Sequence, residues 1–384
     1  MAQKNIHEEI NTLDSIHLVV TIDQNFLQHF YVMFKSLLEN TDLQSNTIHL
    51  HLIHHSIEEK ELTNIQKFFS SNQVRIEFYE IELNYLKDFN ISEHISLATY
   101  YRILIPYLLN NSIQKVIYLD SDMVICKNIR ELWSYDIQKR AIGAVIDLQG
   151  KGRMEELRIP DDYSYFNAGV LIINLQYWRE NNISEKVIDF IKLNPEKLKY
   201  WDQDALNAIL YDKFYYLPYC WNIQTNAYKI DVLENEIRVA LKEPCIIHYT
   251  TASKPWHITN VHPLKEKYHF FLERTPYKKY TMFNNNTTNI LNNKKRVFIF
   301  GAGETGQIIM NFLKDYKNIE GFIDNDLTIR GMERCGKLIY SLNEIKETNF
   351  WDIGVIVSSG HYKSIAEQLK QFGLVEKLDF VHQM

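Results

Sequence analysis

The sequence predicts an α/β fold in which a mixed, mostly parallel sheet with helices on both faces is followed by a small Rossmann-like α/β domain. Strand and helix patterns alternate from residue 16 onward, which is typical of right-handed βαβ units. The stretch 282–293 is asparagine-rich and almost uncharged, which is typical of a linker. A strand, a glycine turn and a helix then begin again. We therefore expect domains at 1–281 and 294–384.

The composition narrows the class of protein. Hydrophobic residues at 46% and charged residues at 23% are ordinary for a soluble globular protein. A net charge of −6 indicates no general affinity for nucleic acid. The N-terminus lacks the apolar run of a signal peptide, no stretch approaches the roughly 20 apolar residues that span a bilayer, and the four cysteines are scattered. We expect a cytoplasmic protein with reduced thiols.

The first domain opens with the elements of a parallel sheet. Strands and helices are expected to alternate in the order 16–23, 26–38, 47–55, 58–69 and 74–81. Ligands collect beyond the carboxyl ends of such strands. Asp23, at the end of the first strand, is therefore a candidate site residue.

Two aspartates follow the next buried strand pattern, at 116–119. Asp120 and Asp122 point to the same side if the extended backbone persists, and they would repel each other without a cation between them. Oxygen ligands suit Mg²⁺ or Mn²⁺, and such an ion usually accompanies a phosphate substrate. The alternative is that Asp120 only ends the strand and Asp122 only caps a turn.

Four further segments combine polar side chains with apolar patterns, at 98–106, 165–180, 201–207 and 246–256. Each has a plain structural interpretation. Arg102 could extend its charge to solvent from a helix, and Asp202 is a good helix N-cap. His248 alone is more often a core residue than a ligand, and Lys254 fits a solvated loop.

Together, in this order, these segments resemble the family 8 glycosyltransferases, which include bacterial lipooligosaccharide galactosyltransferases and glycogenin. The resemblance covers roughly residues 16–281. It implies a GT-A type fold and metal-dependent, retaining transfer of a hexose, glucose or galactose, from a UDP-sugar. The acceptor would be a glycan, protein-linked or lipid-linked sugar, and the product an α-linkage.

The resemblance also implies roles for individual residues. Asp120, Asp122 and His248 match the ligands of Mn²⁺, with Mg²⁺ as the alternative ion. Lys254 matches the lysine that grips the diphosphate. The other implied donor and sugar contacts are Thr21, Asp23, Asn25, Arg102, Ser121, Asp147, Asn167, Asp202 and Gln203.

Two residues, Thr251 and Gln203, do not fit the roles that the resemblance implies. Thr251 stands where the family usually has glycine, and a β-branched residue is strained at positive φ, so we expect this loop to run differently. A double displacement needs a nucleophile, and the matching residue, Gln203, is a poor one. Asp202 or Asp204 could serve instead, or the acceptor could attack on the face of the leaving group, which we favour.

The end of the first domain, 263–281, mixes basic and aromatic residues. It could rest on an anionic membrane, or it could be a helix packed on the domain with a solvated face. Two other functions also stay open. A sugar nucleotidyltransferase uses acidic pairs on similar sheets, and a non-catalytic protein could bind a nucleotide-sugar.

The second domain carries a glycine fingerprint after a short apolar strand: Gly301, Gly303 and Gly306. Asp324 ends a second strand about twenty residues further on, as in dinucleotide-binding units. The domain resembles small Rossmann-type modules such as the N-terminal part of sugar acyltransferases. It either binds a nucleotide at the helix N-terminus or serves only as a docking domain whose glycines form a tight turn.

Overall fold

The structure is a computed structural model that describes residues 15–44, 47–81, 97–137, 139–230, 234–257, 260–278, 285–346 and 352–382. The chain forms two compact units. The first contains the residues up to Thr251 together with Phe270–Thr275, and the second contains Ala252–His269 and the chain from Pro276 onward. Within the described ranges, no helix has the length and apolar character needed to cross a bilayer.

The first unit is built on a seven-stranded sheet in the order β3-β2-β1-β4-β7-β6-β8. Strands β1 to β4 pair in parallel, whereas β7 runs antiparallel to both β4 and β6. The expected mixed, mostly parallel sheet is therefore confirmed. The bounds are β1 Ser15–Ile22, β2 Thr47–His54, β3 Val74–Glu80, β4 Lys115–Leu119, β6 Ile142–Ile146, β7 Phe166–Asn174 and β8 Phe214–Tyr216.

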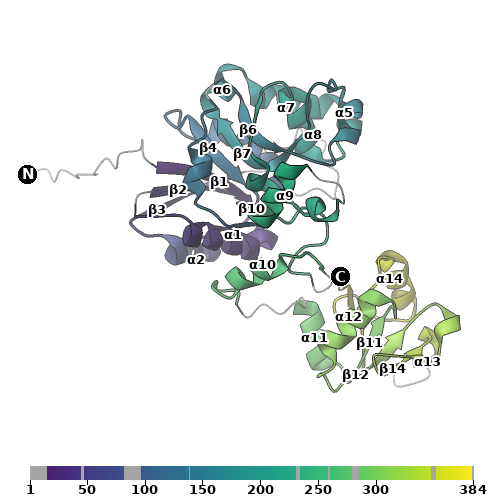
Figure 1. The fold of residues 1–384 in the computed structure, drawn as a ribbon. Helices are drawn as coiled ribbons and strands as arrows, with labels where there is room; N and C mark the ends of the chain where they lie inside the picture. Colours follow the sequence, from purple (N-terminus) through teal and green to yellow (C-terminus); the bar gives the residue numbers. More distant parts are fainter. Residues whose placement is uncertain are drawn as a thin grey trace, which may run out of the picture. The chain divides into compact units, whose positions relative to one another are not determined.

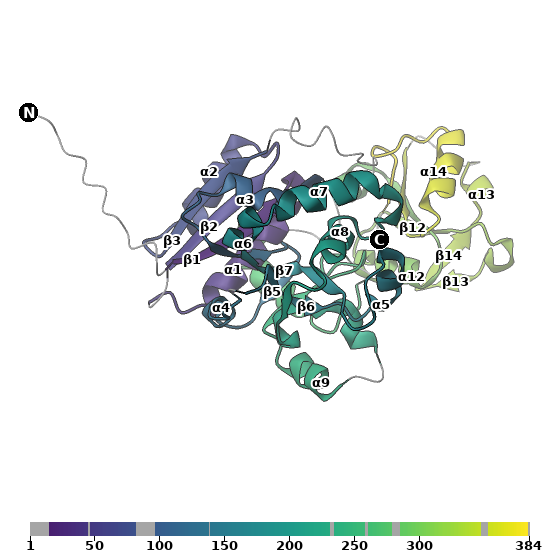
Figure 2. The ribbon, with the colours of Figure 1, turned by 90° about the horizontal axis from the view of Figure 1, so that it is seen from above.

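Helices cover both faces of this sheet (Figures 1 and 2). Helices α1 and α2 pack on one face, and α6, α7 and α8 cover the other. These helices are α1 Leu27–Asn40, α2 Glu59–Phe69, α6 Leu175–Glu180, α7 Ile183–Leu193 and α8 Trp201–Leu210. The expected helix at 98–106 is mostly a 3₁₀ segment, Leu97–Leu104, which continues into α3 Ile105–Leu108. The smaller helices are α4 Ile129–Trp133, α5 Lys151–Leu157, α9 Asn235–Lys242 and α10 Lys265–Leu272.

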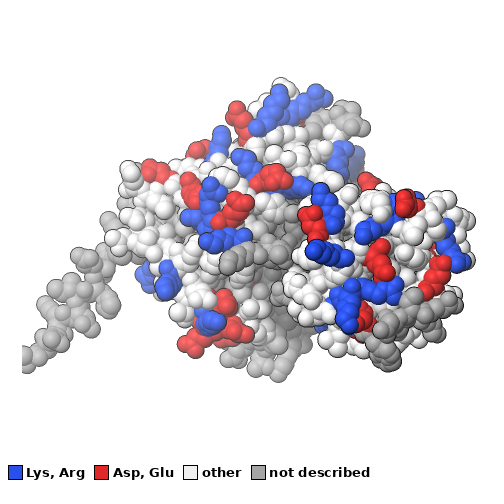
Figure 3. Space-filling view, turned by 90° about the horizontal axis from the view of Figure 1, so that it is seen from below, with Lys and Arg blue, Asp and Glu red and all other residues white. Residues whose placement is uncertain are grey.

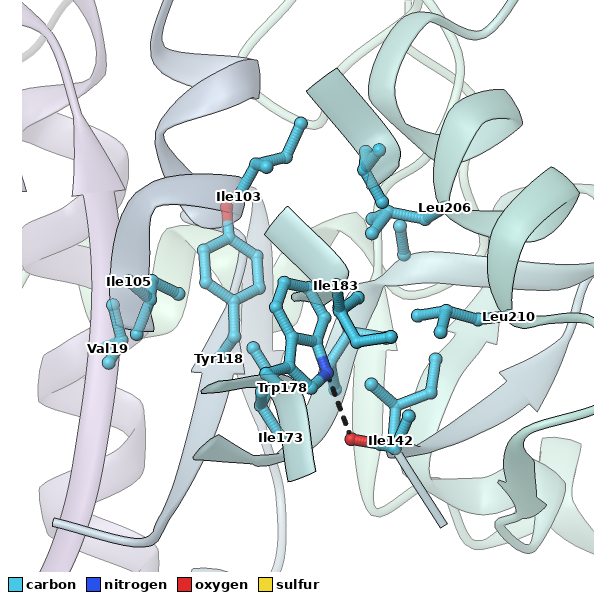
Figure 4. Close-up of a cluster of buried hydrophobic side chains, with 14 of the residues drawn as sticks. Val19, Ile103, Ile105, Tyr118, Ile142, Ile173, Trp178, Ile183, Leu206 and Leu210 are labelled. Atoms are coloured by element: carbon cyan, nitrogen blue, oxygen red, sulfur yellow. Dashed lines mark hydrogen bonds between the residues drawn. The ribbon is translucent and has the colours of Figure 1, made fainter. Parts of the chain in front are cut away.

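A hydrophobic cluster joins the sheet to α6, α7 and α8 (Figure 4). Trp178 lies in this cluster and donates its indole N–H to the carbonyl of Ala141 at 3.1 Å. Tyr118 of β4 is also fully buried there. The cluster fixes β4, and therefore the position at which the two aspartates leave the sheet.

A small three-stranded sheet lies beyond β4, in the order β5-β10-β9. Its strands are β5 Met123–Ile125, β9 Ile223–Gln224 and β10 Ile246–His248. Because β10 runs antiparallel to β5, His248 is paired with Met123, directly after Asp122. This pairing brings distant parts of the chain to one place.

The second unit contains a six-stranded, mostly parallel sheet in the order β13-β14-β12-β11-β15-β16. The strands are β11 Arg296–Phe300, β12 Ile319–Ile323, β13 Glu333–Arg334, β14 Lys337–Tyr340, β15 Ile353–Val357 and β16 Phe380–His382. One face packs against α11 Asn285–Asn293 and α12 Glu304–Leu313, and the other against α13 Leu342–Lys346 and α14 Tyr362–Gln371. The expected second α/β domain is therefore present.

The asparagine-rich segment differs from the expected linker, because most of it is helix α11. Ile290 and Leu291 are buried in the core of the second unit, next to Val297 and Ile299. Two adjacent apolar side chains are enough to fix this polar helix by packing.

Charged residues of both signs are interspersed on the face shown in Figure 3. No broad field of one sign gathers on that face.

Candidate active site

Two carboxylates and one imidazole converge where β4 ends. Asp120 follows β4, Asp122 precedes β5, and His248 ends β10. His248 Nε2 lies 3.4 Å from Asp122 Oδ1 and 3.9 Å from Asp120 Oδ2. One ligand atom from each residue lies within 4.8 Å of the others, which is close enough for one metal ion. Carboxylate oxygens and one imidazole nitrogen form a donor set that suits Mn²⁺.

His248 is oriented by an amide relay from residues outside the cluster. Asn222 donates its Nδ2–H to Asn167 Oδ1 at 2.8 Å, so its own Oδ1 is the acceptor for His248 Nδ1–H at 2.9 Å. This hydrogen bond keeps the proton on Nδ1 and leaves the Nε2 lone pair facing the aspartates. Asn222 was missed from the sequence, because no local pattern marks it.

Gly169 provides the space for this cluster. A Cβ atom at this position would lie 2.8 Å from Asp120 Oδ2 and would collide with Cε1 of His248. The Asp120 backbone N–H also donates to the Gly169 carbonyl at 2.9 Å, so the two chain segments cannot easily separate. The residue must be glycine for steric reasons.

We therefore expect Gly169→Ala to lower metal-dependent activity about 100-fold, because the ligand atoms must move apart. The measurement is Mn²⁺ affinity together with turnover at saturating Mn²⁺. Gly152→Ala is the matched control, since a Cβ at that glycine meets nothing within 4 Å. Equal Mn²⁺ affinity in the two variants would contradict this role of Gly169.

Arg102 is buried and connects three parts of the site. Its Nη2 donates to Asp120 Oδ1 at 3.0 Å, its Nη1 donates to the Ala168 carbonyl at 2.5 Å, and its Nε lies 2.8 Å from Asp202 Oδ2. Burial opposes its charge, but Asp120 and Asp202 together raise the pKa of Arg102. The interpretation of Arg102 as a helix residue with a solvated charge is therefore wrong.

Asp202 is the second partner of this arginine. It lies inside α8, whose N-cap is Tyr200, so the N-cap interpretation of Asp202 is wrong as well. Burial raises the pKa of Asp202 to about 7, although the nearby Arg102 opposes the shift. Asp202 thus contacts Arg102 at Nε, whereas Asp120 contacts it at Nη2.

Tyr118 provides a second contact to Asp120. Its hydroxyl donates to Asp120 Oδ1 at 2.7 Å, and Thr21 Oγ1 lies 2.9 Å from the same hydroxyl. Burial raises the pKa of Tyr118 well above its ordinary value, so the phenol stays a donor. A tyrosine two residues before Asp120 on the same strand face was the available sequence signal.

The remaining expected donor contacts lie near the ends of β1 and β4. Asp23 Oδ1 accepts the backbone N–H groups of Asn25 at 2.8 Å and Phe26 at 3.1 Å, so it caps the 3₁₀ turn Gln24–Phe26. Ser121 is buried, and its Oγ has no hydrogen-bond partner among the described residues. The donor-binding roles of Thr21, Asp23, Asn25 and Ser121 stay predictions.

Gln203 is held by hydrogen bonds at both ends of its amide. Oε1 accepts from Asn167 Nδ2 at 3.1 Å and from the Ala168 N–H at 3.0 Å. Nε2 donates to Asp147 Oδ2 at 3.2 Å and to Tyr165 Oη at 3.2 Å. Asn167, Asp147 and Gln203 therefore form one fixed polar wall, and their contact with a sugar stays a prediction.

Asp204 is fully buried beneath this wall. Its carboxylate accepts from Arg153 Nε at 3.1 Å, Arg153 Nη2 at 2.9 Å, Tyr165 Oη at 2.7 Å and the Tyr200 N–H at 2.7 Å. Four donors occupy both oxygens. This geometry supports a structural carboxylate and not a nucleophile.

A cleft of about 380 Å³ opens beside these groups. Its lining includes Arg102, Asp120, Asp147, Asn167, Trp201 and Gln203. A groove of about 720 Å³ at Lys115, Tyr135 and Tyr177 is larger, but none of the candidate site residues lines it. We place the candidate active site in the smaller cleft because Asp120, Asp147 and Gln203 line it.

Two residues of this cleft have unusual backbones. Thr251 adopts a φ of 81°, and Trp201 adopts a φ of 48°. Thr251 therefore adopts a left-handed conformation despite its β-branched side chain, and the different course expected for this loop stays a prediction. Such conformations cost about 1–3 kcal/mol each and often mark functional positions.

Lys254 lies in a loop of the second compact unit. Its backbone N–H donates to His257 Nδ1 at 3.2 Å. Burial and then the charge of Lys254 lower the pKa of His257. The contact of Lys254 with a diphosphate stays a prediction.

The glycine fingerprint of the second unit serves its own turn. Gly301 has a φ of 105°, and a Cβ at Gly306 would collide with the Gly301 carbonyl. Asp324 Oδ2 accepts the Ala302 N–H at 2.7 Å, and its Oδ1 accepts the Asp326 N–H at 2.9 Å. These contacts support the docking-domain interpretation, although Gly303 faces open space at the N-terminus of α12. Nucleotide binding by Gly301, Gly303, Gly306 and Asp324 stays a prediction.

Comparison with known families assigns both parts of the chain. The model of "Glycosyl transferase family 8" matches residues 17–260. The model "C2185-like, N-terminal" matches residues 293–378. The first match covers more than half of the chain and includes all three candidate metal ligands.

The chain is also similar to individual proteins of known sequence or structure. General stress protein A of Bacillus subtilis is 36% identical over 276 residues, which cover 68% of this chain and 94% of that protein. Lipopolysaccharide 1,2-glucosyltransferase of Escherichia coli is 27% identical, with 70% of this chain and 81% of that protein covered. The crystal structure of galactosyltransferase LgtC with donor and acceptor sugar analogs superimposes with a TM-score of 0.62 at 23% identity, and covers 70% of this chain and 100% of that one. This structural likeness shows the shared fold.

Proposed function

The chain belongs to glycosyl transferase family 8, and from this premise we propose that it transfers a hexose, glucose or galactose, from a UDP-sugar with the help of Mn²⁺. The product would be an α-linked glycoside formed with retention of configuration. The observation that carries the proposal is the cluster of Asp120, Asp122 and His248 beside a cleft walled by fixed amides and carboxylates. Mg²⁺ is the alternative ion.

The candidate residues would have different roles in glycosyl transfer. Asp120, Asp122 and His248 hold the ion, which when bound stabilises negative charge on the departing diphosphate as a Lewis acid. Lys254 supplies a second positive charge to the same group. Arg102 is hydrogen-bonded to Asp120 and contacts Asp202, so it would position the ligand set, and its contact with the donor sugar stays a prediction.

The polar wall supports attack by the acceptor on the face of the leaving group. A double displacement needs a carboxylate with an accessible oxygen. Asp202 is buried against Arg102, and Asp204 is fully buried under four donors. Gln203 would instead orient the sugar and shield its cationic transition state together with Asp147.

A donor screen tests the proposal. The full chain, stripped with chelator and resupplied with Mn²⁺, is incubated with UDP-glucose, UDP-galactose and other nucleotide-sugars while UDP release is measured. We expect release from one UDP-hexose that stops when Mn²⁺ is withheld. Pyrophosphate release from UTP and sugar phosphate would support a nucleotidyltransferase, and donor binding without turnover under every acceptor would support a non-catalytic binding protein.

Trp201 is the proposed platform for the acceptor sugar. It lines the cleft together with Gln203, the residue is 42% exposed, and its backbone is left-handed. We expect Trp201→Ala to raise the KM for the acceptor about tenfold with a smaller change in the donor KM, since one stacked ring contributes about 1 kcal/mol or more. Tyr216→Ala, at an equally exposed tyrosine outside the cleft lining, is the control. A higher donor KM with an unchanged acceptor KM would contradict the assignment.

A lipid-linked glycan is the proposed acceptor, as the name of the lipopolysaccharide glucosyltransferase relative suggests. The membrane contact would lie in the segment 263–281, at the cytoplasmic face. Of this segment the structure describes residues up to 278; α10 buries Tyr268 and leaves Phe270 47% exposed.

We expect the full chain to float with anionic vesicles, and the double variant Lys267→Glu, Arg274→Glu to float at least about tenfold less, since each basic residue contributes about 1 kcal/mol. Lys186→Glu, at an exposed position of α7, is the control for one charge reversal. Equal flotation of the double variant and the control would remove the membrane contact from the proposal.

A further inference from the structure

A cluster of imidazoles lies on the first sheet, at the opposite end of β1 from Asp23. Register pairs His17 of β1 with His49 of β2, and His51 of β2 with Glu77 of β3. Because side chains alternate along a strand, His49 and His51 point to the same face as His17. The same face continues into Val19 and Ile53 of the hydrophobic core. A polar cluster at this position needs a physical explanation.

The three rings lie at ligand-to-ligand distances. His17 Nδ1 is 3.0 Å from His51 Nε2. The ring centroids of His49 and His51 are 4.2 Å apart, and those of His17 and His49 are 5.1 Å apart. One nitrogen from each ring lies within 4.8 Å of the other two. Nitrogen atoms this close can share one small cation after minor side-chain rotation.

The surroundings leave nitrogen lone pairs for such an ion. Tyr79 donates its hydroxyl proton to Glu77 Oε2 at 2.7 Å, so its oxygen accepts from His51 Nδ1–H at 3.1 Å. This places the proton of His51 on Nδ1 and its lone pair on Nε2, toward His17. A histidine whose outer nitrogen is bonded to a carboxylate relay is the usual arrangement of an imidazole metal ligand.

Charge and burial agree with this geometry. Burial lowers the pKa of His51 to about 2, and the neighbouring His49 and His17 lower it further. Burial also lowers the pKa of His49, with Glu77 opposing. His49 Nε2 is buried, and Glu77 Oε1 lies 3.3 Å away. Neutral imidazoles packed at these distances keep lone pairs that can bind a metal ion.

We propose that His17, His49 and His51 form a second metal site, separate from the Asp120, Asp122 and His248 cluster, which binds a divalent transition metal of the Zn²⁺ type. The ion takes the place of the proton between His17 Nδ1 and His51 Nε2, and that proton moves to the other ring nitrogen of His17. Imidazole ligands favour Zn²⁺, Ni²⁺ or Cu²⁺ over Mn²⁺ and Mg²⁺. The two sites therefore select different ions by donor type.

The role of this site is to clamp the sheet and not to take part in transfer. β1 contains eight residues, and at about 3.3 Å per residue His17 lies roughly 20 Å from the end of the strand at which Asp23 stands. The ligands come from two neighbouring strands, so a bound ion ties β1 to β2. Three histidines leave one ligand position of a four-coordinate ion for water or a carboxylate. Glu77, whose side chain is 32% exposed, is the carboxylate next to the three rings.

The test uses the full chain with Asp120→Asn and Asp122→Asn, which removes the first site. After chelation, we expect this chain to bind one equivalent of Zn²⁺ by calorimetry and to melt at a higher temperature with Zn²⁺. Co²⁺ should give the intense visible absorption of a four-coordinate nitrogen site. Adding His49→Gln should weaken Zn²⁺ binding at least about 100-fold, and Tyr79→Phe at least about tenfold.

His54→Gln is the matched control, because His54 is a buried histidine of the same strand that points to the opposite face. It should leave Zn²⁺ affinity unchanged. In the otherwise unaltered chain, His49→Gln should leave Mn²⁺-dependent transfer unchanged. The absence of Zn²⁺ binding and of the Co²⁺ absorption in the double aspartate variant would overturn the proposal without any histidine variant having to fold. Binding that survives both His49→Gln and Tyr79→Phe would overturn it too.

Discussion

Asp122→Asn is expected to lower glycosyl transfer at least about 1000-fold while the chain stays folded. The amide keeps the size of the side chain but removes one of the two negative charges that face the ion next to His248, whose Nε2 lies 3.4 Å from Asp122 Oδ1. A loss of about 4 kcal/mol of transition-state stabilisation corresponds to this factor. UDP release at saturating donor and Mn²⁺, together with near-ultraviolet circular dichroism, measures both parts of the expectation.

Asp122 is a cleaner position for this test than Asp120, because Asp120 also balances the buried charge of Arg102. The control is Asp189→Asn, which makes the same chemical change at an exposed position of α7. Full activity of Asp122→Asn with resupplied Mn²⁺ would contradict the assignment of Asp122 as a metal ligand. A chain that unfolds would say only that the charge is structural, and Mn²⁺ protection against thermal melting in the unaltered chain then decides the question.

The sheet could be predicted because its strands carry their own signal. β1, β2 and β3 begin and end within one residue of the expected spans, since each is a short apolar or alternating run between polar segments. The aspartates after β4 were conspicuous for the same reason. Two carboxylates after a fully buried strand have few structural uses.

The assembly of the site could not be predicted from local patterns. His248 reaches Asp122 only because β10 pairs antiparallel with β5, and this pairing joins segments far apart in the chain. The local sequence favoured a solvated charge for Arg102 and a helix N-cap for Asp202, but the two side chains are buried and contact each other. The three imidazoles near the start of the sheet were also missed, because the register between β1 and β2 is what places His17 beside His49.

Composition misled us where packing decides. The segment 282–293 is rich in asparagine, a weak helix former, so a linker was the natural expectation. Ile290 and Leu291 are 1% and 4% exposed in the core of the second unit, and this contact holds α11. Ile290 and Leu291 are the two apolar residues that indicate a packed helix here, and the average composition of the segment hides them.

Asp204→Ala is expected to destabilise the first unit by about 3–5 kcal/mol, because it leaves the buried guanidinium of Arg153 without its main partner. Arg153 is 4% exposed and binds both oxygens of Asp204. The variant also removes the acceptor of the Tyr165 hydroxyl and of the Tyr200 N–H. Scanning calorimetry should show one melting transition lowered by about 10 °C while the transition of the second unit stays in place.

Asp204→Asn and Glu156→Ala complete this experiment. Asparagine keeps the shape and one oxygen that accepts two of the four donors, so we expect a smaller loss of stability and largely retained transfer. Glu156 also pairs with Arg153, but its side chain is 42% exposed to solvent, so its loss should shift melting little. The three variants separate the nucleophile role that the sequence left open for Asp204 from the structural role that its contacts support. A stable but inactive Asp204→Asn would make it the nucleophile of a double displacement. An unstable Asp204→Ala together with an active Asp204→Asn would show that Asp204 is a structural carboxylate. It then holds the start of α8, and with it Gln203, beside the cleft.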